Sequence, residues 1–133
     1  MSAVVRVTID GEGALARAVM AATRLAAEVG LGPIDRQRVA TAVSELARNV
    51  LRYAVRGEVH LRAVEGASGR RGVELEVRDE GPGIADPEAA MQDHVSSTDS
   101  LGLGLPGVRR LMDEFELRTA VGRGTVVRAT KWR

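Results

Sequence analysis

The stretch "EVRDEGPGI", residues 76–84, joins the end of a strand to a sharp turn. The prediction of fold and function for the whole chain depends on what this turn is for. Polar and apolar residues alternate up to Arg78, which is typical of a strand with one buried face. A carboxylate, Asp79, then comes just before two glycines. A surface hairpin explains this pattern through the fold alone. A ligand site explains it equally, because Gly81 and Gly83 let a flat molecule lie against the backbone while Asp79 hydrogen-bonds its edge.

The composition is that of a soluble globular protein and excludes several classes of function. The 133 residues are 44% hydrophobic and 28% charged, which fits one domain, residues 1–133, with a core made mainly of Val, Leu, Ala and Ile. The net charge of +1 and the three aromatic residues argue against a nucleic-acid partner. The absence of cysteine excludes zinc thiolate sites and cysteine nucleophiles. No apolar run approaches a membrane span, so we expect a cytoplasmic protein with no membrane partner.

The count of basic residues restricts how the chain can bind phosphate. Lys and Arg together number 19, and Lys131 is the only lysine, which leaves 18 arginines. A P-loop requires Gly-Lys-Ser/Thr, whereas Trp132 follows Lys131, so the chain is not a P-loop NTPase. Any phosphate must therefore be held by arginine, backbone N–H groups, a metal ion or a helix terminus.

Hydrophobic periodicity predicts the element order β-α-α-β-β-loop-α-β-β. Residues 85–100 show no clear period, and a loop of this length inside a domain is usually functional or mobile. Consecutive strands with short connections favour antiparallel pairing. We therefore predict an α+β fold, a two-layer α/β sandwich whose mixed, mostly antiparallel sheet carries its helices on one face. Strands are expected at residues 3–9, 58–64, 73–79, 115–121 and 124–132, and helices at residues 14–29, 33–54 and 108–115.

Two polar residues of the second predicted helix are candidates for chemistry. Glu45 and Asn49 are one turn apart and project from the same face, next to Arg48 and Arg52. A solvated polar face explains this spacing by itself. The functional interpretation is an acid that accepts a proton beside a carboxamide oxygen that ligates a hard cation. Asn is a poor helix former, which slightly favours the functional interpretation.

The motif "GLGLPG", residues 102–107, matches G-x-G-x-x-G, which is a weak signal alone. A Rossmann site needs a strand before it and a further βα unit, and a protein-kinase glycine loop lies between two strands; neither context is present. A flexible loop before a helix remains one interpretation. The other is an anion site at a helix N-terminus, with Pro106 in the first turn and Arg109 and Arg110 close by.

Asp79 has the chemistry to select adenine. The exocyclic amine of adenine donates hydrogen bonds, whereas guanine has an oxygen at that position, so a fixed carboxylate accepts the first and repels the second. A second glycine turn, with Gly122, Gly124 and the hydroxyl of Thr125, follows on a strand that we expect near that of Asp79.

Taken together, these segments resemble a known family. The motifs occur in the order and spacing of the N, G1, G2 and G3 boxes of the GHKL, or Bergerat-fold, ATPases, which include histidine kinase catalytic domains, gyrase B, Hsp90, MutL and the anti-sigma-factor serine kinases. The resemblance covers essentially the whole chain. "TAVSELARNVLRYA", "GLPGVRRLMDEF" and the ending "ATKWR" further resemble the RsbT-type switch serine kinases of the bacterial stressosome. The four boxes are "ELARN" (45–49), "DEGPGI" (79–84), "GLGLPG" (102–107) and "GRGT" (122–125).

The resemblance implies a role for each matching residue. Glu45 would be the catalytic general base that deprotonates the acceptor hydroxyl, and Asn49 would ligate Mg²⁺ and thereby help to bind ATP. Asp79 would bind the adenine amine, with Gly81 and Gly83 beneath the ring.

For the phosphates and the lid, the resemblance implies that residues 85–101 close over ATP. This chain has Asp99 and Ser100 where the family tends to be glycine-rich. Thr125 would contact adenine through water. The phosphates would be wrapped by Gly102, Gly104, Leu105 and Gly107.

The implied activity is that of a serine/threonine protein kinase that uses Mg-ATP to phosphorylate a STAS-domain antagonist protein by partner switching. Such a kinase also activates a PP2C-type phosphatase by binding it. The alternative is an anti-sigma factor of the SpoIIAB/RsbW type, which binds a sigma factor and phosphorylates its anti-anti-sigma factor. The chain lacks a phosphoacceptor-histidine helix pair, which argues against a whole histidine kinase.

Overall fold

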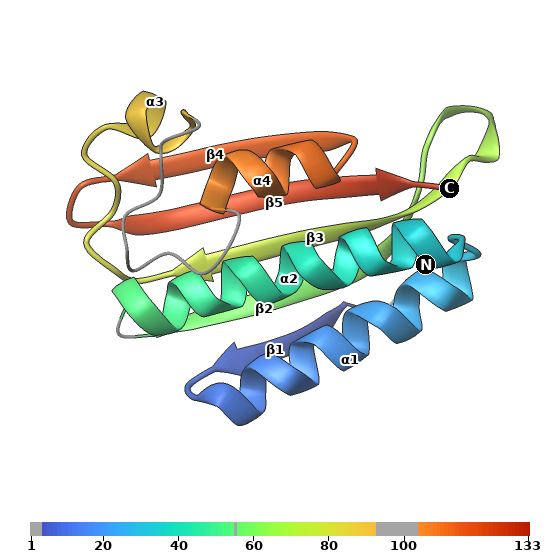
Figure 1. The fold of residues 1–133 in the computed structure, drawn as a ribbon, viewed down its shortest axis with the longest axis horizontal. Helices are drawn as coiled ribbons and strands as arrows, with labels where there is room; N and C mark the ends of the chain where they lie inside the picture. The colour runs from blue at the N-terminus through green and yellow to red at the C-terminus, as the bar shows by residue number, and fades with distance from the viewer. Residues whose placement is uncertain (1–3, 55, 93–103) are drawn as a thin grey trace.

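Five strands form one sheet in which each pairing between described strands is antiparallel (Figure 1). The computed structural model describes residues 4–54, 56–92 and 104–133. The order across the sheet is β1-β2-β3-β5-β4, so β5 lies between β3 and β4. The strands are β1 (Val5–Ile9), β2 (Gly57–Glu65), β3 (Arg71–Asp79), β4 (Glu114–Ala120) and β5 (Gly124–Trp132).

Helices cover one face of this sheet, as Figure 1 shows for α1, α2 and α4. Helix α1 packs on α2 and on β1, β2 and β3, and α2 in turn contacts α4. Among the described residues, no helix is long and apolar enough to span a membrane. The helical elements are α1 (Glu12–Val29), α2 (Pro33–Tyr53), the 3-10 helix η1 (Ala67–Gly69), α3 (Pro87–Ala90) and α4 (Gly104–Leu111).

The core between helices and sheet is built from small and branched aliphatic side chains, as the composition predicts. Helix α1 buries a row of alanines spaced four residues apart, Ala14, Ala18, Ala22 and Ala26, and small side chains let helix and sheet approach closely. The strands contribute alternate residues, such as Val73 and Leu75 of β3, because successive side chains of a strand point to opposite faces.

The structure confirms the predicted α+β class and corrects one helix. The sequence predicts a helix at 108–115, whereas α4 begins at Gly104 and ends at Leu111. The helix stops there because the Asp113 N–H donates to the carbonyl oxygen of Thr130, 2.9 Å away, and this bond directs the chain into the sheet. Phe115 therefore lies in β4, opposite Ala129 of β5.

The predicted loop 85–100 contains a one-turn helix, α3, that the periodicity does not indicate. Asp86 is its N-cap: its Oδ1 accepts from the Ala89 N–H at 3.1 Å, and Pro87 takes the first helical position. Residues 93–100 of that segment, with Asp99 and Ser100, lie outside the described residues, as do Ala3 of the first predicted strand and Gly102.

Hydrogen bonds join the C-terminal end of β5 to Asp113, just after the end of α4. Asp113 accepts a hydrogen bond from Lys131 Nζ at 3.2 Å and another from the Trp132 N–H at 2.7 Å. The Trp132 ring lies over Gly66 and Gly72, where an added Cβ would come within 2.9 Å and 2.7 Å of ring carbons. Lys131, the only lysine of the chain, is thus buried as a structural ion pair.

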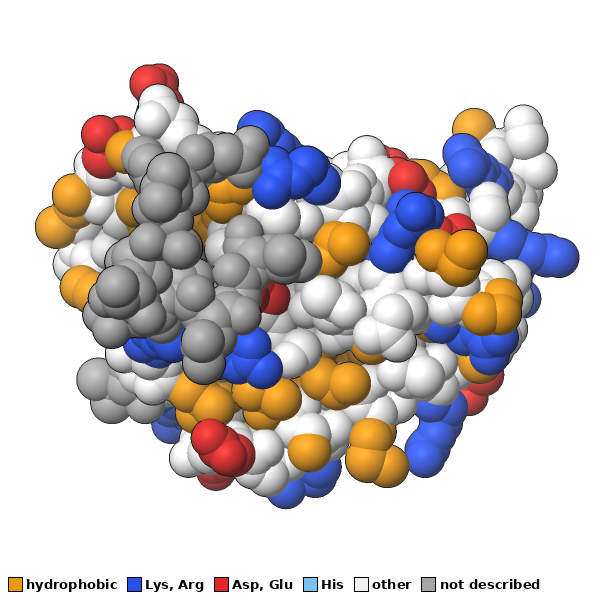
Figure 2. All heavy atoms as spheres, in the orientation of Figure 1, with side chains coloured by type: hydrophobic (Ala, Val, Ile, Leu, Met, Phe, Trp, Pro, Cys, Tyr) orange, Lys and Arg blue, Asp and Glu red, His pale blue; other side chains and the backbone are white. Residues whose placement is uncertain are grey.

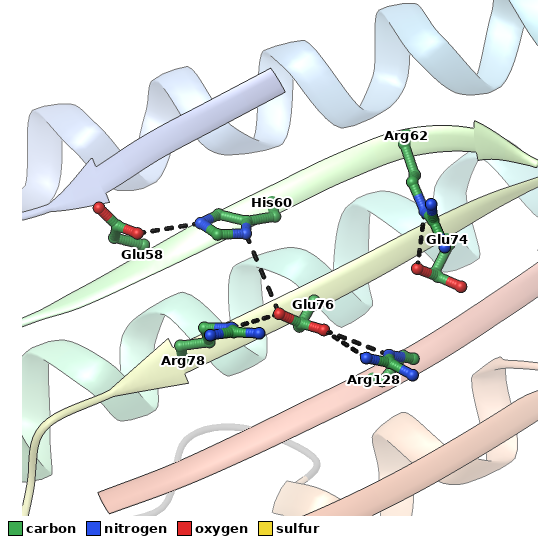
Figure 3. Close-up of polar contacts among 7 residues, drawn as sticks. All are labelled: Glu58, His60, Arg62, Glu74, Glu76, Arg78 and Arg128. Carbon is green, nitrogen blue, oxygen red and sulfur yellow. Dashed lines mark hydrogen bonds and ion pairs between the residues drawn. The ribbon is translucent and has the colours of Figure 1, made fainter. Parts of the chain in front are cut away.

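The open face of the sheet is covered by paired charges rather than by helices (Figure 3). Glu76 lies at the centre, buried under its neighbours, and accepts from Arg78 and from Arg128, whose Nη2 is 2.9 Å away. His60 bonds Glu58 at 2.9 Å and stands 4.0 Å from Glu76. Burial by itself raises the pKa of Glu76, but the two arginine hydrogen bonds outweigh it and hold the pKa below its ordinary value.

Two glycines let the loop after β3 lie directly against the turn between β4 and β5. Both have positive φ: Gly83 has φ 77° and Gly124 has φ 91°. A Cβ on Gly83 would lie 2.2 Å from the Ala120 carbonyl oxygen, and one on Gly124 would lie 2.0 Å from the Asp79 carbonyl oxygen. No other residue type fits either position without movement of the backbone.

We predict that Gly124→Ala lowers the free energy of unfolding by about 3 kcal/mol, because the methyl group clashes with backbone and the left-handed conformation disfavours alanine. Urea unfolding followed by circular dichroism measures the change. Gly32→Ala is the matched control, since Gly32 has φ −70° and no atom within 4 Å of an added Cβ. Equal urea midpoints for the two variants would contradict this account of the turn.

We predict that Glu76→Gln destabilises the protein by about 1 kcal/mol near neutral pH, because it removes the charged acceptor of two arginines. The pKa of Glu76 in the folded protein lies below the ordinary value for a glutamate. The contribution of this carboxylate is therefore complete above that value and is lost as the pH falls through the folded-state pKa. Urea midpoints of both proteins should converge between about pH 7 and about pH 3. A constant difference across that range would show that charge is not the cause.

Candidate functional site

Helix α2 and the start of α4 bring two of the sequence-predicted segments into contact. Val43, Leu46 and Val50 are buried in the core, which fixes the rotation of α2 and places Glu45 at the border facing α4. The Glu45 side chain is only 7% exposed. Its Oε1 accepts a hydrogen bond from the Gly104 N–H at 3.2 Å. A helix carboxylate and a glycine motif 59 residues further along the chain therefore meet at one point.

The other oxygen of Glu45 faces a cation. Arg48 Nη1 lies 4.0 Å from Glu45 Oε2, and Arg48 Nη2 is 3.5 Å from the Ser44 hydroxyl. Asn49 is half-buried and lies one turn beyond Glu45 on the same side of the helix, as the spacing predicts. This arrangement places a shielded acid, a neutral oxygen ligand and a positive charge along one strip of α2.

Asp79 closes the turn in which it lies. Its Oδ1 accepts from the Gly81 N–H at 2.8 Å and from the Thr125 N–H at 3.2 Å. Thr125 is the residue paired with Asp79 between β3 and β5, which confirms that the two predicted segments are neighbours. Within the described part of the chain, Asp79 Oδ2 accepts no hydrogen bond, so one oxygen is fixed by the fold and the other is available.

The glycines around Asp79 have a packing role that the sequence did not reveal. A Cβ on Gly81 would lie 3.0 Å from Ala54 Cβ at the end of α2. Gly83 is required for the approach to Ala120 described above. Both glycines therefore hold the β3 loop between α2 and the β4–β5 turn, whether or not a ligand lies on them.

One residue at this end of the sheet escaped the sequence analysis. The Thr119 hydroxyl accepts from the Ile84 N–H at 2.8 Å, donates to the Gly124 carbonyl oxygen at 3.2 Å and lies 3.0 Å from the Thr125 hydroxyl. Thr119 thus fixes both loops around Asp79. The only signal in the sequence is a polar residue at an inward position of β4, where alternation predicts an apolar one.

The start of α4 has the features of an anion site. Gly104 is its first residue and has φ 67°, and Pro106 and Gly107 are buried against the core while Leu105 is half-buried. The first N–H groups of a helix have no partner within the helix and carry its positive end. Figure 2 shows blue Arg side chains on this helical face of the molecule. Gly102, the first glycine of the motif, lies outside the described residues.

The described residues offer few ligands for a metal ion. Within residues 4–54, 56–92 and 104–133, no three His, Cys, Asp or Glu side chains cluster closely enough to hold one. A cation beside Asn49 would need most of its ligands from elsewhere. That requirement fits Mg²⁺, which usually keeps waters and phosphate oxygens as ligands and takes only one or two from the protein.

Comparison with known proteins agrees with this geometry. Residues 10–131 match the model of the histidine kinase-like ATPase domain. The chain is 45% identical over 108 residues to the serine/threonine-protein kinase RsbT of Bacillus subtilis (strain 168), a match that covers 81% of this chain and 80% of RsbT. It is 32% identical over 97 residues to the anti-sigma F factor of Thermoanaerobacter sp. (strain X514), covering 71% of this chain and 68% of that protein.

A solved structure shares the fold. The RsbU and RsbW domains of Rv1364c from Mycobacterium tuberculosis align with a TM-score of 0.63 at 17% identity. This match covers 100% of the chain and 32% of the larger protein. The predicted family and fold are thereby confirmed, together with the predicted relationship to ATP-dependent serine/threonine kinases. The chain belongs to the family of histidine kinase-like ATPase domains and, within it, is related to the serine/threonine-protein kinase RsbT.

Proposed function

We propose that this protein is a serine/threonine-protein kinase that uses Mg-ATP to phosphorylate a STAS-domain protein in a bacterial partner-switching pathway of the stressosome type. The observation that carries the proposal is the buried Glu45 carboxylate at the N-terminus of α4. It combines a proton acceptor with backbone N–H groups suited to phosphate. The 45% identity to RsbT gives the class of reaction.

Glu45 is the general base in this proposal. It orients the serine or threonine hydroxyl of the partner and accepts its proton as the oxygen attacks the γ-phosphorus and ADP leaves. Phosphoryl transfer demands positioning and charge stabilisation more than covalent chemistry from the protein, so one acid and a set of fixed dipoles suffice. Burial protects Glu45 from bulk water, which strengthens its interaction with the hydroxyl.

The proposed nucleotide contacts are those that the resemblance to the family implies, and the free oxygen of Asp79 supports the one to adenine. The free Oδ2 of Asp79 accepts from the adenine amine, with Gly81 and Gly83 beneath the ring and Thr125 bound through water. Asn49 would hold Mg²⁺ through its side-chain oxygen, and the ion would supply positive charge that offsets the charge of the phosphates. The phosphates contact Gly102, Gly104, Leu105 and Gly107.

The partner and the setting are proposed from the relationship to RsbT. A STAS-domain protein is the substrate and a PP2C-type phosphatase is a binding partner, all in the cytoplasm. The second candidate function is an anti-sigma factor that binds a sigma factor and phosphorylates its anti-anti-sigma factor. It is favoured by the 32% identity to the anti-sigma F factor, which is lower than that to RsbT.

The direct test of this proposal is incubation with Mg-ATP and candidate STAS-domain proteins, followed by mass spectrometry of each one.

We predict that Glu45→Ala lowers the rate of phosphate transfer by at least about 10²-fold, the usual contribution of a general base, while ATP still binds. Glu28→Ala, which removes an exposed carboxylate of α1, is the matched control and should transfer at the normal rate. Undiminished transfer by Glu45→Ala would refute the role given to Glu45.

We predict that Asp79→Asn weakens ATP binding by about tenfold or more, because a charged acceptor is replaced by an amide that cannot accept from the amine as strongly. The asparagine oxygen still accepts from the Gly81 N–H, so the turn is kept. Calorimetric titration with ATP and GTP measures the loss for each base, and Asp10→Asn, at an exposed residue just after β1, is the control. An unchanged preference for ATP over GTP would remove Asp79 from adenine recognition.

A further inference from the structure

The Gly104 N–H, which the proposed function assigns to a phosphate oxygen, already has an acceptor in this structure. Glu45 Oε1 lies 3.2 Å from it, and the side chain that reaches it is 7% exposed. A hydrogen bond to an ionised acceptor in such a shielded place is stronger than one between neutral groups. Glu45 therefore holds the anion position at the start of α4 with its own negative charge.

One N–H group cannot donate a good hydrogen bond to two anions at the same time. A phosphate oxygen that is to accept from Gly104 must replace Glu45 Oε1, because both would approach the same hydrogen from the same side. The two anions also repel each other at short range in a shielded site. The bond between Glu45 and Gly104 and the binding of phosphate to Gly104 are consequently in competition.

We propose that the nucleotide phosphates displace Glu45 from the Gly104 N–H, and that this displacement frees the carboxylate to act as the base. The inference rests on the proposed function and adds a mode of regulation to the same site. Glu45 is unavailable for proton transfer until a phosphate chain reaches α4. Adenosine alone has no phosphate, so it leaves Glu45 hydrogen-bonded to the Gly104 N–H. Arg48, 4.0 Å from Oε2, stays beside the carboxylate after its release and balances its charge.

The competition predicts that removal of the base increases the affinity for the nucleotide, whereas the loss of a binding-site residue usually decreases it. We expect Glu45→Ala to bind ATP about tenfold more tightly than the unaltered protein, since phosphate no longer has to break a charge-assisted hydrogen bond. Adenosine should bind both proteins with the same affinity, because it has no phosphate to reach Gly104. Calorimetric titration with ATP, ADP and adenosine in the presence of Mg²⁺ gives these affinities.

A second variant separates competition from simple charge repulsion. Glu45→Gln removes the charge but keeps a side-chain oxygen that can accept from Gly104, so it should tighten ATP binding less than Glu45→Ala does. Equal tightening in the two variants would mean that repulsion alone is responsible and would overturn the proposal. Unchanged or weaker ATP binding by Glu45→Ala would overturn it as well.

The Gly104 amide reports on the contact directly. In ¹⁵N-labelled protein we expect its hydrogen exchange to be slowed in the unaltered protein and to quicken in Glu45→Ala without nucleotide. Adding ATP should shift the Gly104 resonance in both proteins, whereas adenosine should leave it in place. An amide whose exchange is the same in both proteins would contradict the contact itself.

The two proposals fail in different ways. If neither the unaltered protein nor Glu45→Ala binds ATP, the kinase function fails and the competition has no ligand. If both bind ATP with the same affinity while only the unaltered protein transfers phosphate, the kinase function stands and the competition is refuted.

Discussion

One hydrogen bond, from the Gly104 N–H to Glu45, joins the two halves of the proposed site. Glu45 belongs to α2, which is fixed in the core by its apolar face, and Gly104 begins α4, which is fixed at its other end by Asp113 and β5. Any change in the position of either helix alters the distance between acid and amide. The chemistry of the site is therefore limited by helix packing over the sheet, which in turn depends on the small alanine side chains of α1.

The second constraint is the closeness of the two loops around Asp79. Gly83 and Gly124 bring the backbone of one loop within van der Waals contact of the other, and Thr119 joins them by hydrogen bonds. Asp79 uses one oxygen for this structure and leaves the other free. A residue that is fixed by the fold loses little entropy when it binds a ligand, which would favour the proposed recognition of adenine.

Much of the fold followed from local patterns, and most of what did not follow depended on contacts between distant segments. Alternation predicted β3 and β5 because one face of each strand is buried, and their expected place side by side is confirmed by the pairing of Asp79 with Thr125. The helix predicted at 108–115 exists but ends earlier, at Leu111, because the bond from Asp113 to Thr130 is a tertiary contact that periodicity cannot show. Helix α3 was missed although Asp86 and Pro87 form a standard helix start, since four residues give no measurable period.

The same distinction holds for the site. The four motifs predicted which residues form the site, and the spacing of Glu45 and Asn49 placed them on one side of α2. The contact between Glu45 and Gly104 required the packing of α2 on α4, and the role of Thr119 required the pairing of β4 with β5. Glu76 lies on the open face of the sheet, as alternation along β3 predicts, but it is buried there because two long arginine side chains fold over it.

That covered face gives a reason for the abundance of arginine. Arg128 approaches one oxygen of Glu76 through both Nε and Nη2, and neighbouring strands repeat the pairing of a planar guanidinium with a carboxylate, as between Arg62 and Glu74. Lysine carries a compact ammonium on a flexible stem and cannot form such a fork. The open face of the sheet thus carries a network of ion pairs. Replacing its arginines with lysines would keep every charge but would lose the paired N–H contacts that hold the carboxylates in place.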